Sequence, residues 1–214
     1  MTPRAHNVTS YGCALVALPA VVAVRSATHA APALTWQVAL PVALWVVHFA
    51  RRSLEALRLH RYSKPAFPLG DAVVEYVYYW GFGLWIGWTL TAPSAAFASH
   101  PWLGTALFFT GELGNHRCHR MLAALRPTAG SERPIPRGFL FEWVSCPHYL
   151  FEITSWVGFA LVAPSSATLG FLLLGSAILS FWGFQRHRDY RRRFDGSTGP
   201  EYPPERRALV PFVF

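Results

Sequence analysis

Residues 166–184 read SATLGFLLLGSAILSFWGF, a stretch without a charged side chain. A helix needs about 20 mostly apolar residues to cross a bilayer, so this stretch is long enough to form a span. Five other stretches are similarly apolar: residues 11–24, 34–50, 72–91, 101–114 and 139–162. Two of these, residues 11–24 and 101–114, are short for a span. The pattern predicts an all-α, polytopic membrane helix bundle with about six transmembrane helices, whose cytoplasmic loops form a cofactor site.

The composition of the chain supports a membrane protein. Of its 214 residues, 52% are hydrophobic and 14% are charged, whereas roughly 25% of the residues of a soluble domain are charged. No polar block of domain size separates the apolar stretches, so we expect a single membrane domain over residues 1–214. The three cysteines are too few for a disulfide framework and lack the paired spacing of a zinc site.

Basic residues predict which side of the membrane each loop faces. If all six stretches cross, the N-terminus, the loops 51–71 and 115–138 and the C-terminal tail share one side, which carries every Lys and Arg except Arg25. The positive-inside rule makes that side cytoplasmic. Both termini are then cytoplasmic, at a bacterial inner membrane or the endoplasmic reticulum. Topology therefore explains the net charge of +8 without a nucleic-acid partner.

Residues 1–31 allow a second interpretation. Arg4 precedes an apolar run that ends in small residues, as in a secretory signal. Five spans with the same sidedness would then remain.

Arginine outnumbers lysine 18 to 1. A GC-rich genome explains this bias, and so does phosphate binding, because a guanidinium group binds phosphate bidentately. Arginines flank the inner ends of the last three predicted spans, where they would contact either a phosphate-bearing ligand from the cytosol or lipid headgroups. These residues are Arg126, Arg133, Arg137, Arg186 and Arg188.

Polar side chains in three of the predicted helices are informative, because lipid makes them costly unless they face a bundle interior or a wet cavity. In the first group, His148, Glu152, Ser155 and Trp156 fall on one helical face. An interhelical hydrogen bond without a ligand is the alternative explanation for this group. Because all three groups lie at cytoplasmic helix ends, we predict one shared pocket. The other two groups are Glu112, Asn115, His116, His119 and Arg126, and His187 with Tyr190.

A metal site or a nucleotide-binding motif would also explain some of these residues. Glu112, His116, His119 and His148 are suitable metal ligands, but the H-x-x-H-H boxes of membrane di-iron enzymes are absent from the sequence, and we predict no metal. The sequence has no G-x-x-x-x-G-K-[ST] motif, and the glycines of residues 80–87 lack G-x-G-x-x-G spacing. Any dinucleotide would therefore bind in the helical bundle itself.

Several separate motifs occur together in this chain. They include GNHRCHRMLAALRP at 114–127, RPIP at 133–136, VSCPHY at 144–149 and the tail residues Tyr202–Pro204 and 211–214. Together with His48 and residues 78–82, they resemble the trans-2-enoyl-CoA reductase branch of the steroid 5-alpha-reductase superfamily, over about residues 45–214.

The resemblance implies a membrane reductase that takes NADPH from the cytosolic side. Nicotinamide would deliver hydride to the beta carbon of a carbon-carbon double bond conjugated to a carbonyl, while a donor polarises the carbonyl oxygen and the alpha carbon takes a proton. The substrate would be lipid-like, an acyl-CoA, sterol or polyprenyl compound. The cofactor-binding positions of the family fall on Asn115, His119, Arg126, Arg133, His148, Glu152, Trp156, His187 and Tyr190.

The chain departs from the family at three positions. His148 stands where the family has Asn, Ser10 falls near the polarising glutamate of the family, and Phe49 replaces a tyrosine after His48. The resemblance leaves Tyr149 as the candidate proton donor, with His48 as its possible substitute. Two alternatives stay open: a membrane methyltransferase of the isoprenylcysteine type, and a non-catalytic relative that keeps the fold.

Overall fold

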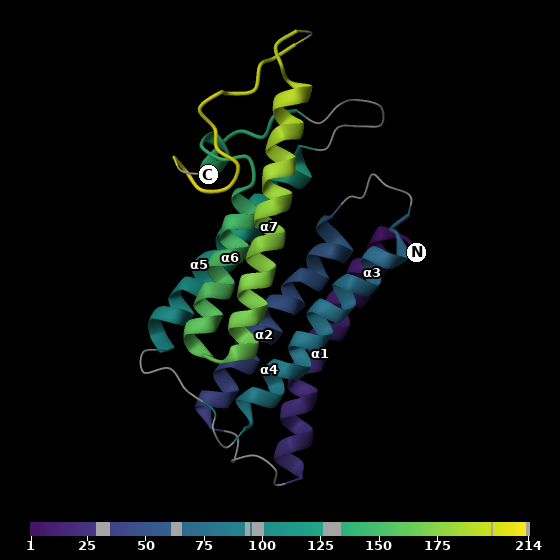
Figure 1. The fold of residues 1–214 in the computed structure, drawn as a ribbon, viewed down its shortest axis with the longest axis vertical. Coiled ribbons are helices and arrows are strands. Elements are labelled where there is room, and N and C mark those ends of the chain that lie inside the picture. The colour runs from purple at the N-terminus through teal and green to yellow at the C-terminus, as the bar shows by residue number, and fades with distance from the viewer. Residues whose placement is uncertain are drawn as a thin grey trace. The chain divides into compact units, whose positions relative to one another are not determined.

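The computed structural model describes residues 1–28, 35–60, 66–92, 95, 101–125, 134–197 and 199–212. Within these ranges the chain is helical and forms no β-strand, which confirms the all-α prediction (Figure 1). The helices are α1 (Pro3–Ala27), α2 (Trp36–Leu54), α3 (Leu69–Tyr76), α4 (Phe82–Leu90), α5 (Pro101–Ala124), α6 (Pro147–Val162) and α7 (Ser166–Arg193).

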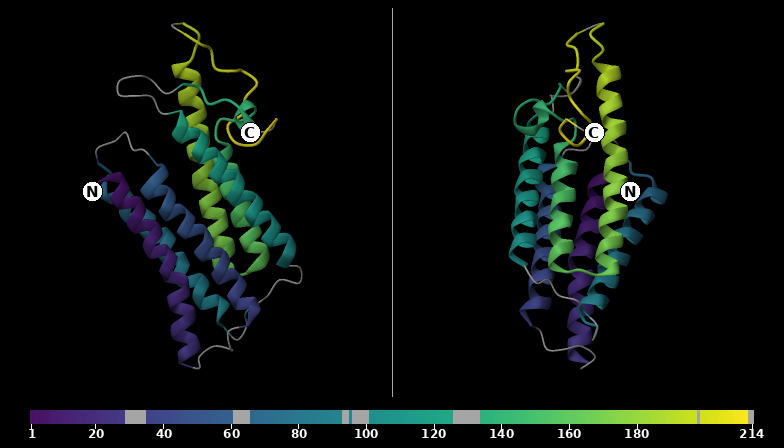
Figure 2. Two further views of the ribbon diagram at one scale, coloured as in Figure 1. Left: turned by 180° about the vertical axis from the view of Figure 1, so that it is seen from behind. Right: turned by 60° about the vertical axis from the view of Figure 1, so that its left-hand side comes forward.

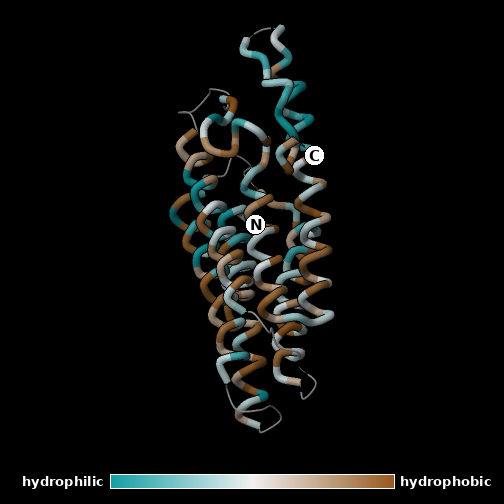
Figure 3. Tube along the Cα trace, turned by 90° about the vertical axis from the view of Figure 1, so that its left-hand side faces the viewer, coloured by the Kyte–Doolittle hydropathy of each residue, from teal (hydrophilic) through white to brown (hydrophobic). Residues whose placement is uncertain are grey.

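Two of these helices, α1 and α7, are long and apolar enough to cross a membrane when judged within the described ranges. Helix α7 exposes large apolar side chains such as Leu169, Leu173 and Phe181, which suits a surface in contact with lipid. Hydrophilic residues gather at its C-terminal end, where the arginines lie (Figure 3). The number of six spans stays a prediction.

Two predicted stretches differ in detail from the observed helices. Residues 72–91 fall on α3 and α4, which are joined by a π-helical turn at Val77–Gly81. Over residues 139–162, the chain first forms a 3-10 turn at Phe139–Glu142, and α6 begins only at Pro147. A proline has no N–H to donate and is favoured at the first helical position, which explains this start.

The chain forms two compact units, and the prediction of a single domain stays a prediction. The first unit comprises Met1–Phe108 and Trp156–Leu172, and the second comprises Phe109–Ser155 and Leu173–Phe214. Helices α5, α6 and α7 therefore contribute residues to both units, and each unit is described by itself.

An aromatic core holds the first unit together. Trp45 of α2 is fully buried, and its Nε1 donates to the carbonyl of Ala14 in α1 at 2.7 Å. Helix α4 also packs on α1. The contact is at Gly87, where a Cβ would lie 3.0 Å from the Leu18 carbonyl oxygen of α1. Figure 2 shows α1, α2 and α4 running alongside one another.

Close helix packing and the C-terminal tail define the second unit. A Cβ at Gly111 of α5 would lie 2.5 Å from the Phe151 carbonyl oxygen of α6, so the two backbones touch there. The tail pairs with the segment before α6, because the Ser145 N–H donates to the Arg207 carbonyl at 2.9 Å and the Cys146 N–H to Ala208 at 3.1 Å. These bonds hold the start of α6 against the tail.

Candidate functional site

The second unit contains a polar cluster centred on the Ser145 hydroxyl. Its Oγ lies 2.6 Å from Nδ1 of His187 and 2.7 Å from the Tyr202 hydroxyl, and it donates to the Arg207 carbonyl at 3.2 Å. A hydroxyl has one proton and two lone pairs. The Ser145 hydroxyl can therefore join His187, Tyr202 and the tail at once, which fixes all three side chains.

Stacked rings extend this cluster along α7. The rings of Tyr190 and Tyr202 are 5.4 Å apart and nearly parallel, and the His187 ring lies edge-on to Tyr202 at 5.9 Å. His187 and Tyr190 lie one turn apart on α7, so they share one face. Burial raises the pKa of Tyr202, which keeps its hydroxyl protonated as a donor.

Helices α5 and α6 bring together a second group of predicted residues. Asn115 donates through Nδ2 to the His148 carbonyl at 2.8 Å, and the rings of His119 and His148 are 5.8 Å apart. The His148 ring lies 4.2 Å from the Tyr149 ring. Glu152 follows one turn later on α6 and is buried.

Helix α7 approaches the start of α6 through Gly183. A Cβ there would lie 3.6 Å from the Tyr149 ring and 3.8 Å from Cβ of Cys146. Gly183 precedes His187 by one helical turn, so the same face of α7 presents both residues to α6. The second unit therefore places the predicted residues of α6 and α7 beside one another.

The remaining predicted residues fall elsewhere. His48 and Trp156 lie in the first unit, where both are buried and their ring centroids are 4.4 Å apart. Phe49 packs on the same two rings, at 4.9 Å from His48 and 6.0 Å from Trp156. Arg126 and Arg133 lie outside the described residues.

The structure adds Ser145, Tyr202 and Arg206 to the candidate site. Arg206 is 1% exposed and donates to the Pro136 carbonyl at 2.8 Å and to the Glu142 carboxylate at 3.2 Å. Its guanidinium also lies 5.3 Å from the Tyr202 ring centroid. Ser145 and Tyr202 lie in the motifs that carry the family resemblance, but no helical spacing relates either of them to the other predicted residues. Nothing in the sequence distinguishes Arg206 from the other basic residues.

Replacing Arg206 by Ala is expected to lower the free energy of unfolding by about 2 kcal/mol, because the buried carbonyl of Pro136 loses a charged donor. Thermal denaturation of the detergent-purified variant measures this loss. The neighbouring Arg207 has an exposed side chain, so Arg207→Ala is the matched control and should stay within about 0.5 kcal/mol of wild type. Equal stability of both variants would contradict a supporting role for the Arg206 contacts.

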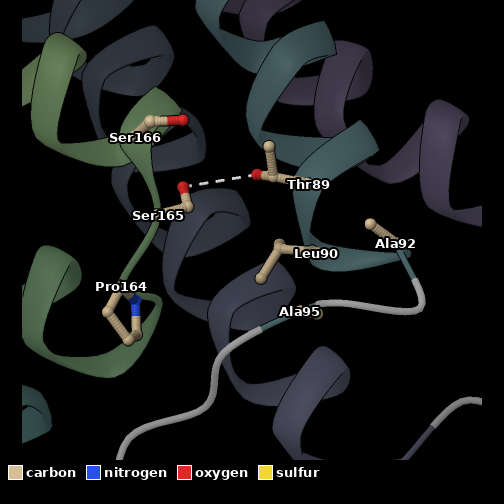
Figure 4. A pocket seen from close by; sticks show the side chains of 7 residues that line it. All are labelled: Thr89, Leu90, Ala92, Ala95, Pro164, Ser165 and Ser166. Atoms are coloured by element: carbon tan, nitrogen blue, oxygen red, sulfur yellow. Dashed lines mark hydrogen bonds between the residues drawn. The ribbon is translucent and has the colours of Figure 1, made fainter.

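A cavity in the first unit contains none of the predicted residues. It encloses about 220 Å³ between the end of α4 and the turn before α7 (Figure 4). Thr89 and Ser165 line it, with their hydroxyl oxygens 3.3 Å apart. Ligand pockets usually enclose about 300–1,000 Å³, so this cavity is too small for a dinucleotide.

Comparisons with known proteins show what the chain resembles. Residues 65–214 match the family described as 3-oxo-5-alpha-steroid 4-dehydrogenase. The chain is 37% identical to the "Very-long-chain enoyl-CoA reductase" of Dictyostelium discoideum over 78% of its own length and 55% of the relative. It is 34% identical to the "Probable very-long-chain enoyl-CoA reductase" of Caenorhabditis elegans, over 79% and 56% of the two chains.

A human relative, "Trans-2,3-enoyl-CoA reductase-like", is 31% identical over 78% of this chain and 47% of that protein. The chain thus spans about half the length of the curated relatives it matches.

Proposed function

This chain belongs to the steroid 5-alpha-reductase superfamily, in its enoyl-CoA reductase-like branch, and we propose on that premise that it is a membrane oxidoreductase. It reduces a carbon-carbon double bond conjugated to a carbonyl in a lipid substrate, of the enoyl-CoA or 3-oxo-4-ene steroid type, with NADPH as the reductant. Both of its termini face the cytoplasm, from which the cofactor enters.

The observation that carries this proposal is the gathering of hydrogen-bonding side chains in the second unit. Ser145, His187 and Tyr202 form one bonded group, and Asn115 is bonded to the His148 backbone. Buried polar groups are costly in a membrane bundle and usually mark a functional site. In a helix bundle that binds no ligand, so many hydrogen-bonding side chains at neighbouring helix ends would add little to stability.

The chemistry of these donors fits a nicotinamide dinucleotide phosphate. Imidazole, amide and phenol groups suit the carboxamide and ribose parts, and arginines suit phosphates because they bind them bidentately. Arg186 and Arg188 flank His187 on α7, and both are exposed. We assign the phosphate groups of the cofactor to these two arginines together with Arg126 and Arg133. The nicotinamide and ribose parts of the cofactor are assigned to the remaining predicted residues, which are Asn115, His119, His148, Glu152, Trp156, His187 and Tyr190.

When bound, NADPH supplies the hydride for the beta carbon. The phenol of Tyr149 gives the proton to the alpha carbon, and its ring is held against the His148 ring at 4.2 Å. His148 fills the position of a family asparagine and orients Tyr149, while Asn115 fixes the His148 backbone at 2.8 Å. His48 is the alternative donor.

Binding of NADPH to the detergent-purified protein tests the proposed cofactor. We expect saturable enhancement of nicotinamide fluorescence that neither NADH nor S-adenosylmethionine displaces, and NADPH oxidation when enoyl-CoAs or enone sterols are added. Displacement by S-adenosylmethionine would indicate a methyltransferase. NADPH binding without oxidation of any enone would indicate a non-catalytic relative.

The Arg126→Ala variant is expected to weaken NADPH binding about tenfold, because a bidentate phosphate contact contributes roughly 1.5 kcal/mol or more. The fluorescence titration gives its Kd directly. Arg4→Ala, at the exposed start of α1, removes the same charge from a helix to which no cofactor contact is assigned, and serves as the control. An equal loss of affinity in both variants would show that only the overall positive charge matters.

A further inference from the structure

The C-terminal tail meets helix α7 at Tyr202. The ring of Tyr202 is parallel to the Tyr190 ring, with 3° between the planes and 5.4 Å between the centroids, and it lies 5.9 Å from the His187 ring. Its hydroxyl lies 2.7 Å from Ser145 Oγ, which in turn lies 2.6 Å from Nδ1 of His187. One tail residue therefore neighbours both residues of α7 that are assigned to the cofactor.

A turn after α7 brings the tail back to the helix. Gly196 has a φ of 82°, in the left-handed region that favours glycine. The Asp195 carboxylate accepts from the N–H and the hydroxyl of Ser197, at 2.9 and 2.6 Å. Further along the tail, the Tyr202 N–H donates to the Phe194 carbonyl at 2.8 Å. This bond holds the Tyr202 backbone beside the end of α7.

The two residues that link the tail to His187 are themselves enclosed. Ser145 is 2% exposed and Tyr202 is 3% exposed. The Ser145 N–H donates to the Arg207 carbonyl at 2.9 Å, and the Arg206 guanidinium lies 5.3 Å from the Tyr202 ring centroid. Because both side chains are buried and bonded within the protein, any role they have in binding a ligand is indirect.

His187 is placed differently, because its side chain is partly exposed. An imidazole ring has two nitrogens. The Ser145 hydroxyl engages Nδ1, which leaves the Nε2 side of the ring to meet a ligand. A side chain that is already fixed does not have to be ordered when the ligand binds, so the entropic cost of binding is smaller.

We propose that Ser145 and Tyr202 are positioning residues, which hold the His187 imidazole through Nδ1 in the orientation that binds NADPH. This inference rests on the cofactor site of the proposed function. Neither residue touches the cofactor. The segment before α6 and the C-terminal tail together preorganise the part of the site that α7 contributes.

Two substitutions remove the links one at a time. Ser145→Ala removes the hydroxyl and keeps the backbone bonds to the tail, and it is expected to raise the Kd for NADPH about fivefold because the His187 ring is no longer fixed. Tyr202→Phe keeps the ring beside Tyr190 and removes one partner of Ser145, so we expect a rise of about threefold. Nicotinamide fluorescence measures both values of Kd.

Tyr78→Phe is the matched control, because it also removes a hydroxyl that is hydrogen-bonded within the protein. The Tyr78 hydroxyl donates to the Phe171 carbonyl at 2.8 Å in the first unit. No contact with the cofactor is assigned to it, so its Kd for NADPH should stay within about 1.5-fold of wild type.

A double-mutant cycle with His187→Ala distinguishes positioning from general support of the fold. If Ser145 acts through His187, Ser145→Ala should change Kd by less than about 1.5-fold once His187 has been replaced. A general structural contribution would instead raise Kd by the same factor with His187 present or absent. If Ser145→Ala cannot be purified, Tyr202→Phe in the same two backgrounds provides the same comparison.

The outcomes separate this inference from the proposed function. A rise in Kd that disappears in the His187→Ala background supports positioning. Equal rises in both backgrounds, or values of Kd for Ser145→Ala and Tyr202→Phe that match wild type, would overturn it and leave the NADPH site standing. A wild-type protein that binds no NADPH would refute the proposed cofactor itself, and the positioning role with it.

Discussion

The Tyr149→Phe variant is expected to reduce enoyl substrates about 100-fold more slowly than wild type, because loss of a proton donor usually costs roughly 10²- to 10⁴-fold in rate. Phenylalanine keeps the ring that packs at 4.2 Å from His148 and faces Gly183 of α7. Cofactor affinity should therefore stay within about twofold. NADPH oxidation gives kcat, and nicotinamide fluorescence gives Kd, so the two quantities are measured separately.

Tyr78→Phe is the matched control for this change. The Tyr78 hydroxyl donates to the Phe171 carbonyl at 2.8 Å within the first unit, and no contact with cofactor or substrate is assigned to it. It should keep kcat within a few-fold of wild type. If Tyr149→Phe also keeps its rate, Tyr149 is not the proton donor, and His48→Gln becomes the variant to measure.

The Gly111→Val variant is expected to yield no folded protein. A Cβ at residue 111 would lie 2.5 Å from both the Phe151 carbonyl oxygen and the Ser155 backbone nitrogen, and closer still to the Ser155 hydroxyl. Backbone atoms cannot move aside as a side-chain end can, so α5 and α6 would have to separate. Overpacking of this kind costs about 3 kcal/mol or more, a large part of the roughly 5–15 kcal/mol that stabilise a typical protein.

The yield of monodisperse protein after detergent extraction and size-exclusion chromatography measures this effect. Gly12→Ala provides the control, since Gly12 also lies within a helix and a Cβ there meets no atom within 4 Å. That variant should fold and gain up to about 1 kcal/mol from the better helix propensity of alanine. Normal recovery of Gly111→Val would contradict the backbone contact between α5 and α6.

Much of the fold could be predicted from the sequence, because its signals are local. Apolar stretches mark the helices, and the arginines after residue 184 mark the polar end of α7. Boundaries were predicted less well where a neighbouring segment decides them. The apolar residues 139–146 look like the start of a span, but backbone pairing of Ser145 and Cys146 with the tail keeps them out of α6.

The candidate site was also predictable in part. Spacing along single helices placed His148 and Glu152 on a common face of α6, and it singled out Asn115 and His187 in two further polar groups. The structure brings Asn115 to His148 and His187 to the segment before α6. The roles assigned to these residues stay predictions until the variants above are measured.

The sequence by itself determined the helices, their apolar faces and the family, because each depends on residues close together in the chain or on whole motifs. Only the tertiary structure joined Ser145 to Tyr202, buried Arg206 against Pro136, and paired His6 with Glu75. The partners in these contacts are 57, 70 and 69 residues apart. No periodicity links positions so distant, and only the packing of helices and tail in three dimensions brings their polar atoms within bonding distance.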